Sequence, residues 1–456
     1  MDGIAEESKS NKRQWIYPLI RKGPYYKWRS WISYFYLAFL FTGPFIRING
    51  QPLLLLNFID RQFILFGQVF WPQDIFLFVL ATLVFIVCIV LFTIAFGRVF
   101  CGWVCPQTIF MEMVFRKVEE WIEGDAKKRK RLDAGPWTRE KIIRKSGKIA
   151  VFIIISFLIA NTFLAYIIGS DSLIKIITEP VGKHVVGFIS IWVFTIVFFV
   201  VYNRIREQVC TLFCPYGRLQ GVMIDQHTLV VAYDDVRGEP RGKIDKKHDQ
   251  PGAKGDCVDC GLCVDVCPTG IDIRKGTQLE CINCTACIDV CNEVMDKIHK
   301  PHNLIGYFSE NMIHEKEKPT FTGRMMAYSS VILVLVSVMC YFIFTRSDLD
   351  VTIMRSPNML YQSQPGGYIS NIYNAEFINK TNQRKSFTMR SGDPAVKIKY
   401  IQAPGVMEKQ GSVKAVFFVM VPGSQIRSVK TDIPLQLIVG DKVVKTVNAE
   451  FVGPID

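Results

Sequence analysis

The chain has 456 residues, of which 50% are hydrophobic and 33 are Phe, and its formal net charge is +13 at pH 7. This composition is too apolar for an ordinary soluble protein with a single core. The basic excess does not by itself indicate a nucleic-acid partner, because membrane proteins concentrate Lys and Arg in cytoplasmic loops.

In chain order, the apolar residues collect in runs long enough to cross a bilayer core about 30 Å thick, which takes about 20 helical residues. No small-residue cleavage site precedes the first run, so we expect a retained helix rather than a cleaved secretory signal. Five membrane helices are predicted, at about 31–46, 75–96, 149–168, 185–202 and 326–344.

The distribution of Lys and Arg orients these helices. The segment 1–30 carries seven, the loop 116–148 carries twelve and the stretch 203–325 carries sixteen, whereas the loops 47–74 and 169–184 carry two each. The positive-inside rule therefore places the first three segments in the cytoplasm.

Two copies of one cysteine pattern lie between the fourth and fifth predicted helices. Each copy reads C-x2-C-x2-C-x3-C, the spacing of bacterial two-cluster ferredoxins. Three thiolates on one tight loop can reach three irons of a cubane, while the fourth points to the neighbouring cluster. The first cluster is expected on Cys257, Cys260, Cys263 and Cys291, and the second on Cys281, Cys284, Cys287 and Cys267.

A disulfide framework and a pair of zinc sites are the alternatives for these eight cysteines. Disulfide bonds do not require a duplicated metal-ligand spacing. Zinc sites normally use two Cys-x-x-Cys arms separated by a longer stretch. One departure from the ferredoxin pattern is Asn292, which stands where a proline would follow the fourth cysteine, as Pro268 does in the first copy.

Two further cysteine pairs follow the second and fourth predicted helices. They are Cys101 with Cys105 and Cys210 with Cys214, and each pair is followed directly by a proline, so both read C-x3-C-P. Cysteines four positions apart lie on one face of a helix, and the proline suits the first turn of a new helix. Each pair is therefore expected at a bend on the cytoplasmic membrane surface.

Several roles are open for these four thiols. Soft thiolates at low coordination number select Cu(I) over harder ions. A dithiol can also cycle through a disulfide or help to hold another iron–sulfur centre, and buried cysteines can simply pack between helices. Two identical pairs at equivalent helix ends favour a chemical role. Cys88 and Cys340 lack a spaced partner and are interpreted as packing residues.

The sequence offers little support for a nucleic-acid partner, a haem or a nucleotide cofactor. The basic run Lys127 to Arg131 is interpreted as a solvated face near anionic lipid, not as a nucleic-acid patch. His184 alone lies close to the end of a predicted helix, so no bis-histidine haem is expected in the bilayer. Neither a c-type haem motif nor a phosphate-binding glycine loop occurs, so electrons are expected from another protein or a small reductant.

The segment 345–456, beyond the fifth predicted helix, contains no cysteine. Short strands at regular spacing suggest a small antiparallel sandwich. A poorly ordered tail is the alternative, but the density of Val, Ile and Phe argues against it. Strands are predicted at 368–379, 396–401, 414–421, 433–439 and 442–451.

Over nearly its whole length the chain resembles a known family, the cytochrome c oxidase accessory proteins called CcoG, FixG or RdxA. The resemblance implies an immunoglobulin-like tail, a part in assembling cbb3-type haem–copper oxidases, and reduction of Cu(II) to Cu(I) for delivery to the oxidase. Besides the doubled ferredoxin pattern, it rests on Phe70-Trp-Pro-Gln-Asp74, Cys101-Gly-Trp-Val-Cys105-Pro-Gln107, Cys210-Thr-Leu-Phe-Cys214-Pro-Tyr-Gly-Arg218, Asn371-Ile-Tyr-Asn and Asn379-Lys-Thr.

The residues and the resemblance together predict a polytopic α-helical protein of the bacterial inner membrane. It carries an inserted two-cluster ferredoxin-like domain and a C-terminal all-β immunoglobulin-like sandwich. The expected parts are a cytoplasmic segment (1–30), a membrane domain (31–236), a cytoplasmic domain with two [4Fe–4S] clusters (237–310), a fifth helix (326–344) and a periplasmic sandwich (345–456).

The expected function is that of a cupric reductase-type oxidoreductase. Cys101, Cys105, Cys210 and Cys214 would hold copper, and the clusters would receive electrons from a cytoplasmic donor. Expected partners are oxidase assembly factors, copper chaperones or transporters, and membrane lipid, with a homodimer left open. Two alternatives remain: an electron relay between quinol or flavin and a cytoplasmic partner, and a non-enzymatic redox-sensing assembly scaffold.

Overall fold

In the computed structural model the chain falls into two compact units, one formed by residues 1–46 and 78–338 and the other by residues 47–77 and 339–456. Within the segment 1–30, the described residues begin at Trp15. In the motif at 70–74, Pro72 and Gln73 lie outside the described residues. The structure describes residues 15–48, 50–57, 62–71, 74–243, 254–318, 320–347, 349–356, 360–381, 383–402, 405–409, 411–426, 428–439 and 442–454.

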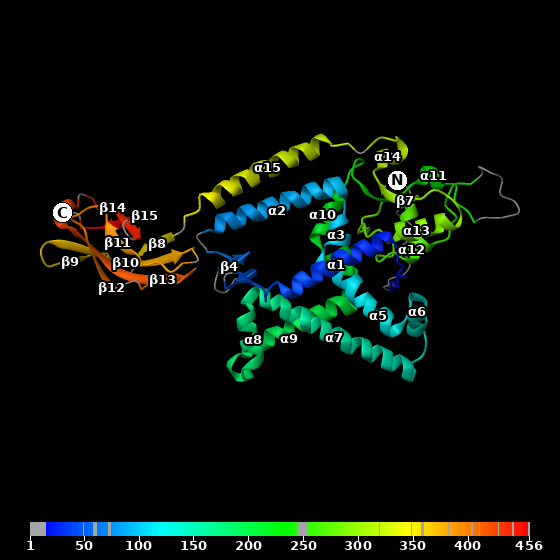
Figure 1. The fold of residues 1–456 in the computed structure, drawn as a ribbon, viewed down its shortest axis with the longest axis horizontal. Helices are drawn as coiled ribbons and strands as arrows, with labels where there is room; N and C mark the ends of the chain where they lie inside the picture. The colour runs from blue at the N-terminus through cyan, green and yellow to red at the C-terminus, as the bar shows by residue number, and fades with distance from the viewer. Residues whose placement is uncertain are drawn as a thin grey trace. The chain divides into compact units, whose positions relative to one another are not determined.

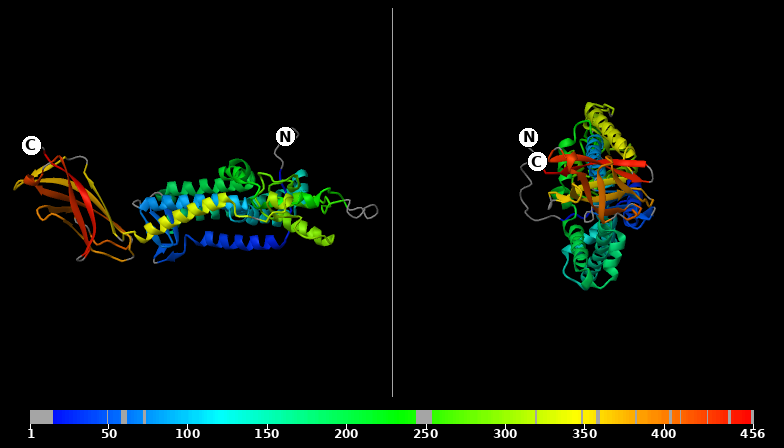
Figure 2. Two further views of the ribbon diagram at one scale, coloured as in Figure 1. Left: turned by 90° about the horizontal axis from the view of Figure 1, so that it is seen from above. Right: turned by 90° about the vertical axis from the view of Figure 1, so that its left-hand side faces the viewer.

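Four helices among the described residues are long and apolar enough to cross a membrane. Within the first unit, α7 crosses α9, and the parts of α2 and α15 that belong to this unit run side by side (Figures 1 and 2). The four coincide with the last four predicted membrane helices. They are α2 (Ile75–Phe96), α7 (Arg139–Ile168), α9 (Val185–Val200) continued by η4 (Val201–Ile205), and α15 (Gly323–Phe344).

Helix α7 begins well before the expected start at about 149. The side chain of Thr138 caps it by accepting a hydrogen bond from the backbone N–H of Lys141 at 3.3 Å. Its basic first turns carry ion pairs, such as Lys148 with Glu123 at 3.0 Å. The charged residues of these turns lower the local hydropathy, so the hydropathy pattern missed the start of the helix. The same residues form ion pairs with neighbouring segments.

The first predicted membrane helix is present as α1 (Pro24–Thr42), but it is not among the four apolar helices. The Arg29 side chain on α1 is buried and donates from Nε to the carbonyl oxygen of Gly102 at 2.8 Å. At its start, the backbone N–H groups of Tyr25 and Tyr26 donate to the carboxylate of Asp289. These contacts explain the polar residues of α1, and a fifth membrane crossing stays a prediction.

Shorter helices complete the first unit. Three of the described helical segments are π-helical, a rare form that is frequent at functional sites. One follows the first C-x3-C-P segment, one precedes the second, and one contains Cys210. The shorter helices up to residue 238 are α3 (Val99–Trp103), α4 (Pro106–Ile109), η2 (Phe110–Phe115, π), α5 (Arg116–Glu123), α6 (Ala126–Ala134), α8 (Ser170–Thr178), η3 (Val181–Lys183), η5 (Val209–Phe213, π), α10 (Pro215–Met223) and α11 (Asp235–Gly238); η4 is the third π-helix.

The ferredoxin-like part is closed by an antiparallel pair of strands, β6 (Val230–Tyr233) and β7 (Ile305–Phe308). This pairing starts before the boundary expected at 237. Its core contains Val231, Ile288, Met295, Leu304 and Ile305, all buried. The helices of this part are α12 (Leu262–Asp265), η6 (Ile273–Lys275), α13 (Ala286–Lys297) and α14 (Glu310–His314).

The second unit contains two facing sheets that enclose one apolar core, as the orange and red strands of Figure 2 show. One sheet has the order β12-β13-β10-β8, with β9 also pairing with β10, and the other has the order β11-β14-β15. The strands are β8 (Leu349–Arg355), β9 (Gln362–Gln364), β10 (Tyr368–Asn379), β11 (Thr388–Ser391), β12 (Lys397–Gln402), β13 (Ser412–Pro422), β14 (Lys430–Val439) and β15 (Lys442–Val452); the short η7 (Gly423–Gln425) follows β13.

Side chains of β13 and β14 alternate between buried and less buried positions, as expected for strands with one face on a core. All five predicted strands are present within a few residues of their expected bounds. β8, β9 and β11 were not predicted, although Leu349, Val351 and Ile353 alternate along β8.

The loop 47–74 folds into two small sheets that the sequence did not predict. β3, β4 and β5 form one antiparallel sheet, and β1 pairs with β2. Leu55, Ile64, Val69 and Trp71 pack together with Ile378 at the end of β10. The strands are β1 (Arg47–Ile48), β2 (Gln51–Pro52), β3 (Leu54–Asn57), β4 (Gln62–Leu65) and β5 (Gln68–Phe70).

A buried ionic cluster lies where β8 and β10 meet the start of α2. Asp74 accepts hydrogen bonds from Lys380 Nζ and from Arg346 Nη2, both at 2.6 Å, and its side chain is only 4% exposed. Lys380 and Lys445 both pair with Asp350. Two carboxylates thus pair with three cations within the second unit.

Replacing Asp74 with Asn should destabilise the second unit by about 3 kcal/mol or more, because two buried cations would lose their shared counter-charge. Chemical denaturation of the full-length protein in detergent measures this change. Arg384→Ala is the control: its ion pair with Glu408 is exposed, so we expect a loss of about 1 kcal/mol or less. Equal effects of the two substitutions would contradict the prediction.

Candidate iron–sulfur and thiol site

The eight ferredoxin-type cysteines surround two neighbouring hollows in the first unit. The thiols around each hollow correspond to one of the two expected ligand sets, with Cys263 lining both hollows. One hollow is lined by Cys257, Cys260, Cys263 and Cys291, and the other by Cys267, Cys281, Cys284 and Cys287.

The donor set of the two hollows fits iron–sulfur clusters. Neither hollow is lined by a carboxylate or an imidazole. Nowhere in the described part of the chain do three His, Cys, Asp or Glu side chains lie close enough to hold a single metal ion. Thiols spread around a hollow suit a cubane better than a tetrahedral zinc ion.

The two cluster loops share one backbone conformation. Asp259 and Asn283, each directly before the second cysteine of its copy, both have φ of +51°. Gly261 and Thr285, each directly after that cysteine, also have positive φ values of +72° and +66°. Such values are uncommon outside glycine, although Asn and Asp tolerate them best. The repeated turn directs successive thiols to one side of the loop.

Burial governs the electrostatics of these thiols. It raises the pKa of Cys281 and Cys291 to about 12, and that of Cys263 and Cys284 to about 11. A buried thiolate loses its hydration, so the neutral form is favoured until a positive group compensates. The iron of a bound cluster supplies such positive charge.

The C-x3-C-P cysteines are arranged in the same way in both copies. Cys101 lies on α3 and Cys105 is the N-cap residue of α4, whereas Cys210 lies on η5 and Cys214 is the N-cap residue of α10. The backbone N–H of Cys105 donates to Phe100 at 2.9 Å, and that of Cys214 donates to Val209 at 2.8 Å, across the same five-residue separation.

The expectation that both cysteines of a pair share one helical face was wrong. Each helix ends between its two cysteines, and Cys105 and Cys214 have ψ angles of 124° and 109°. The following proline causes this, because its ring disfavours a helical conformation in the residue before it. The bend itself was expected, and it occurs at both motifs.

The structure brings the two motifs together. The Cys101 thiol donates to Gln220 Oε1 on α10 at 3.3 Å. The rings of Phe100 and Tyr216 meet edge to face with centroids 6.2 Å apart. Burial raises the pKa of Cys101 to about 12, and the nearby charges of Cys105, Cys210 and Cys214 add to the rise. All four thiols therefore lie within electrostatic reach of one another.

The first motif lies directly against the second cluster loop. A Cβ atom at Gly102 would lie 2.4 Å from the carbonyl oxygen of Ile282 and 3.0 Å from the backbone nitrogen of Cys284. The indole Nε1 of Trp103 donates to the carbonyl oxygen of Asn283 at 3.2 Å. Only glycine permits so close an approach of the two backbones.

A buried ion pair positions the second C-x3-C-P motif, which contains Cys210 and Cys214. Arg206, which has a φ of +57°, donates to both carboxylate oxygens of Glu119 on α5, at 3.1 and 2.7 Å. Burial opposes ionisation of Glu119, but the charges of Arg206 and Lys148 hold its pKa below the usual value. A bidentate pair of this kind fixes both direction and distance, so it holds the turn before Cys210 in place.

Several residues of this site could not be identified from the sequence. Gln220 and Arg29 contact the first C-x3-C-P motif through side chains that no spacing rule marks. Inside the second cluster loop, Asn283 Oδ1 accepts a hydrogen bond from the backbone N–H of Val231. Gly102 offered a weak signal, because a glycine inside a cysteine pair suggests close backbone approach. Glu119 lies in the charged loop 116–148, where nothing in the sequence distinguishes it from a solvent-exposed acid.

Three family models match the chain, and they cover the two cysteine regions and the tail. Residues 78–129 match a 4Fe-4S binding domain, residues 205–310 match a 4Fe-4S dicluster domain, and residues 339–454 match the "IG-like fold at C-terminal of FixG". The immunoglobulin-like character expected for the tail is thereby shown, and so is the presence of 4Fe-4S binding domains.

Curated relatives align over most of the chain. Protein RdxB of Cereibacter sphaeroides is 34% identical over 391 residues, which is 82% of this chain and 81% of the relative. Protein RdxA of the same organism is 35% identical with the same coverage. Nitrogen fixation protein FixG of Rhizobium meliloti is 31% identical over 424 residues, or 84% of this chain and 80% of the relative.

A crystal structure of a FixG-related protein from Vibrio parahaemolyticus covers 24% of this chain and 99% of its own, with 18% identity and a TM-score of 0.21. The relatives, the domain matches and the four apolar helices agree on one class of protein. The chain belongs to the FixG/RdxA family of iron–sulfur membrane oxidoreductases.

Proposed function

We propose that the four C-x3-C-P thiols bind Cu(II) and that the copper is reduced there to Cu(I), consuming one electron per ion. Cys257, Cys260, Cys263 and Cys291 would hold one [4Fe–4S] cluster, and Cys267, Cys281, Cys284 and Cys287 the other. When bound, these clusters supply electrons one at a time.

The close approach at Gly102 is the observation that carries this proposal. The backbone of the first C-x3-C-P motif touches the loop that contains Cys284, with no side chain between them. Trp103 adds a hydrogen bond to the same loop. A copper ion on Cys101 would therefore lie beside the second group of cluster cysteines, without an intervening domain.

The thiols suit copper better than harder ions. Thiolate sulfur is soft and stabilises Cu(I) relative to Cu(II), which favours reduction and retains the product. No three of these thiols are close enough in the described structure to hold one ion. We infer that copper binds at low coordination number, which Cu(I) accepts. Binding requires deprotonation, so the buried thiols release protons as copper enters.

We further propose an orientation and a destination. The distribution of Lys and Arg supports a cytoplasmic N-terminus and cluster domain and a periplasmic sandwich. Cu(I) would pass to a copper chaperone or transporter that serves a cbb3-type oxidase. The sandwich would contact assembly partners, and a cytoplasmic protein would supply electrons.

Replacing Cys101, Cys105, Cys210 and Cys214 together with Ser should lower the rate of Cu(II) reduction about tenfold or more, because loss of even an outer-shell partner of a metal ligand typically costs that much. The assay uses anaerobically purified full-length protein, reduced with dithionite and freed of excess reductant, with a Cu(I)-specific chromogenic chelator. Iron should remain at about eight atoms per chain, which shows that the clusters survive.

Cys340→Ser is the matched control, because Cys340 lies on the part of α15 that belongs to the second unit, whereas both motifs belong to the first. It should leave the rate of copper reduction and the iron content unchanged. A quadruple variant that keeps its iron and still reduces Cu(II) at the full rate would refute the proposed copper site. Normal oxidase maturation with Cys260→Ser and Cys284→Ser, at unchanged protein level, would instead support a scaffold.

Gly102→Ala tests the contact between the two sites. The new methyl group would meet the backbone at Ile282 and Cys284, so the second cluster loop should shift. We expect iron to fall from about eight towards about four atoms per chain, with a changed EPR signal of the reduced protein.

Gly147→Ala on α7 is the control for this substitution, since a Cβ atom there meets nothing within 4 Å. It should keep full iron content. If Gly102→Ala also retained all its iron, an unchanged EPR signal and the full copper reduction rate, the contact would not couple the sites.

A further inference from the structure

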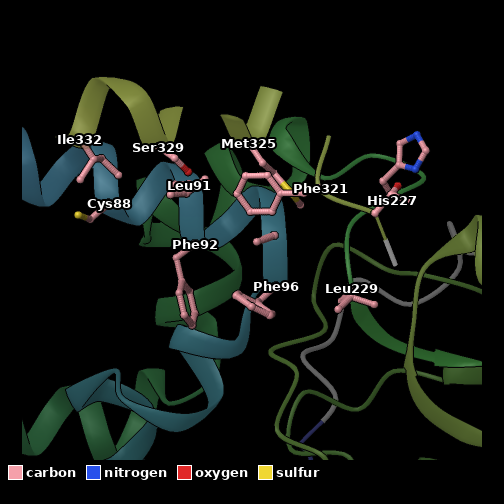
Figure 3. Close-up of a pocket in the computed structure, with 12 residues that line it drawn as sticks. Cys88, Leu91, Phe92, Phe96, His227, Leu229, Phe321, Met325, Ser329 and Ile332 are labelled. Carbon is pink, nitrogen blue, oxygen red and sulfur yellow. The ribbon is translucent and has the colours of Figure 1, made fainter. Parts of the chain in front are cut away.

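A pocket of about 580 Å³ opens between α2 and α15 in the first unit. Figure 3 shows Phe321 and Met325 above Phe92 and Phe96 of α2, with Cys88 and His227 at opposite ends. This volume falls within the range of pockets that hold small organic ligands.

The position of the pocket suits a ligand that comes from the lipid phase. It lies between two helices that are apolar enough to cross a membrane. Phe92 and Phe96 remain 40% and 45% exposed along its wall. A molecule dissolved in the bilayer could therefore enter sideways between the helices, whereas the apolar wall offers little to a polar solute.

Three polar side chains line the otherwise apolar pocket. His227, Thr320 and Ser329 contribute groups that can donate or accept hydrogen bonds. The His227 ring points away from the two phenylalanines on α2 (Figure 3), and its Nδ1 lies 3.4 Å from Asn311 Nδ2. No Lys, Arg, Asp or Glu lines the pocket, so no cation is present there to bind a phosphate.

The apolar wall is connected to the second cluster loop. Asn283, between Cys281 and Cys284, donates from Nδ2 to the carbonyl oxygen of Phe96 at 3.4 Å. Leu229, which also lines the pocket, donates from its backbone N–H to the carbonyl oxygen of Ala95 at 3.1 Å. A ligand against Phe96 is thus one hydrogen bond away from a loop that carries cluster cysteines.

We propose that this pocket binds the ring of a quinone, with the isoprenoid tail leaving between α2 and α15 into the bilayer. A flat ring packs well against phenylalanine faces, and its carbonyl oxygens can accept hydrogen bonds from the hydroxyl groups of Thr320 and Ser329. The missing cations disfavour a phospholipid headgroup or a flavin nucleotide, both of which carry phosphate. The connection to Asn283 links the bound molecule to the redox part of the chain. The proposal does not depend on copper chemistry.

Ala95→Trp should fill the pocket and weaken binding of a short-chain quinone about tenfold or more. Binding is measured by titration of the full-length protein in detergent, and by photolabelling with an azido-quinone followed by peptide mass spectrometry. The unsubstituted protein should be labelled within 88–96 or 320–332. Ser329→Phe provides a second obstruction from the opposite helix, and iron content reports folding of both variants.

Leu83→Trp is the control, since Leu83 lies on α2, is 44% exposed and does not line the pocket. It should bind quinone as the unsubstituted protein does. Three results would overturn the proposal: unchanged quinone binding in both obstructed variants with full iron content, labels confined to other peptides, or a retained phospholipid that quinone does not displace.

Discussion

The close approach between Gly102 and the backbone of Ile282 and Cys284 is the constraint on which the proposed site depends. A glycine without a side chain allows two loops from distant parts of the chain to touch. Trp103 and Arg29 then hold that contact with hydrogen bonds to Asn283 and to Gly102 itself. Two motifs that are separate in sequence thereby become neighbours in space.

Buried charges do much of the positioning elsewhere in the chain. In the first unit, Glu119 and Arg206 fix the turn before Cys210. In the second unit, Asp74 and Lys380 connect the start of α2 to the sandwich. Such pairs offset the cost of desolvation only when their hydrogen bonds are well made. They favour one arrangement of helices and strands strongly, because removing either partner leaves an unbalanced buried charge.

The chain uses each of its chemical motifs twice. In both cluster loops, the residues directly before and after the second cysteine have positive φ values. The two C-x3-C-P motifs repeat the same five-residue hydrogen bond and the same proline-induced bend. Their surroundings differ, since Cys101 contacts Gln220 whereas Cys210 follows the strained Arg206. Repetition accounts for the local shape, and the neighbours of each copy account for its specific contacts.

The sequence alone determined the features that arise from local spacing. The cysteine patterns predicted which thiols group together, apolar runs predicted the four helices that can cross a membrane, and alternation predicted five strands of the sandwich. Tertiary structure decided the rest, because contacts such as Gly102 with Cys284 join residues far apart in the chain. α1 falls outside the apolar group by its own composition, and only the tertiary structure shows that its Arg29 donates to a distant carbonyl oxygen. Residue spacing predicts which side chains of one element or loop act together. Packing between elements determines which of these groups lie next to each other in space.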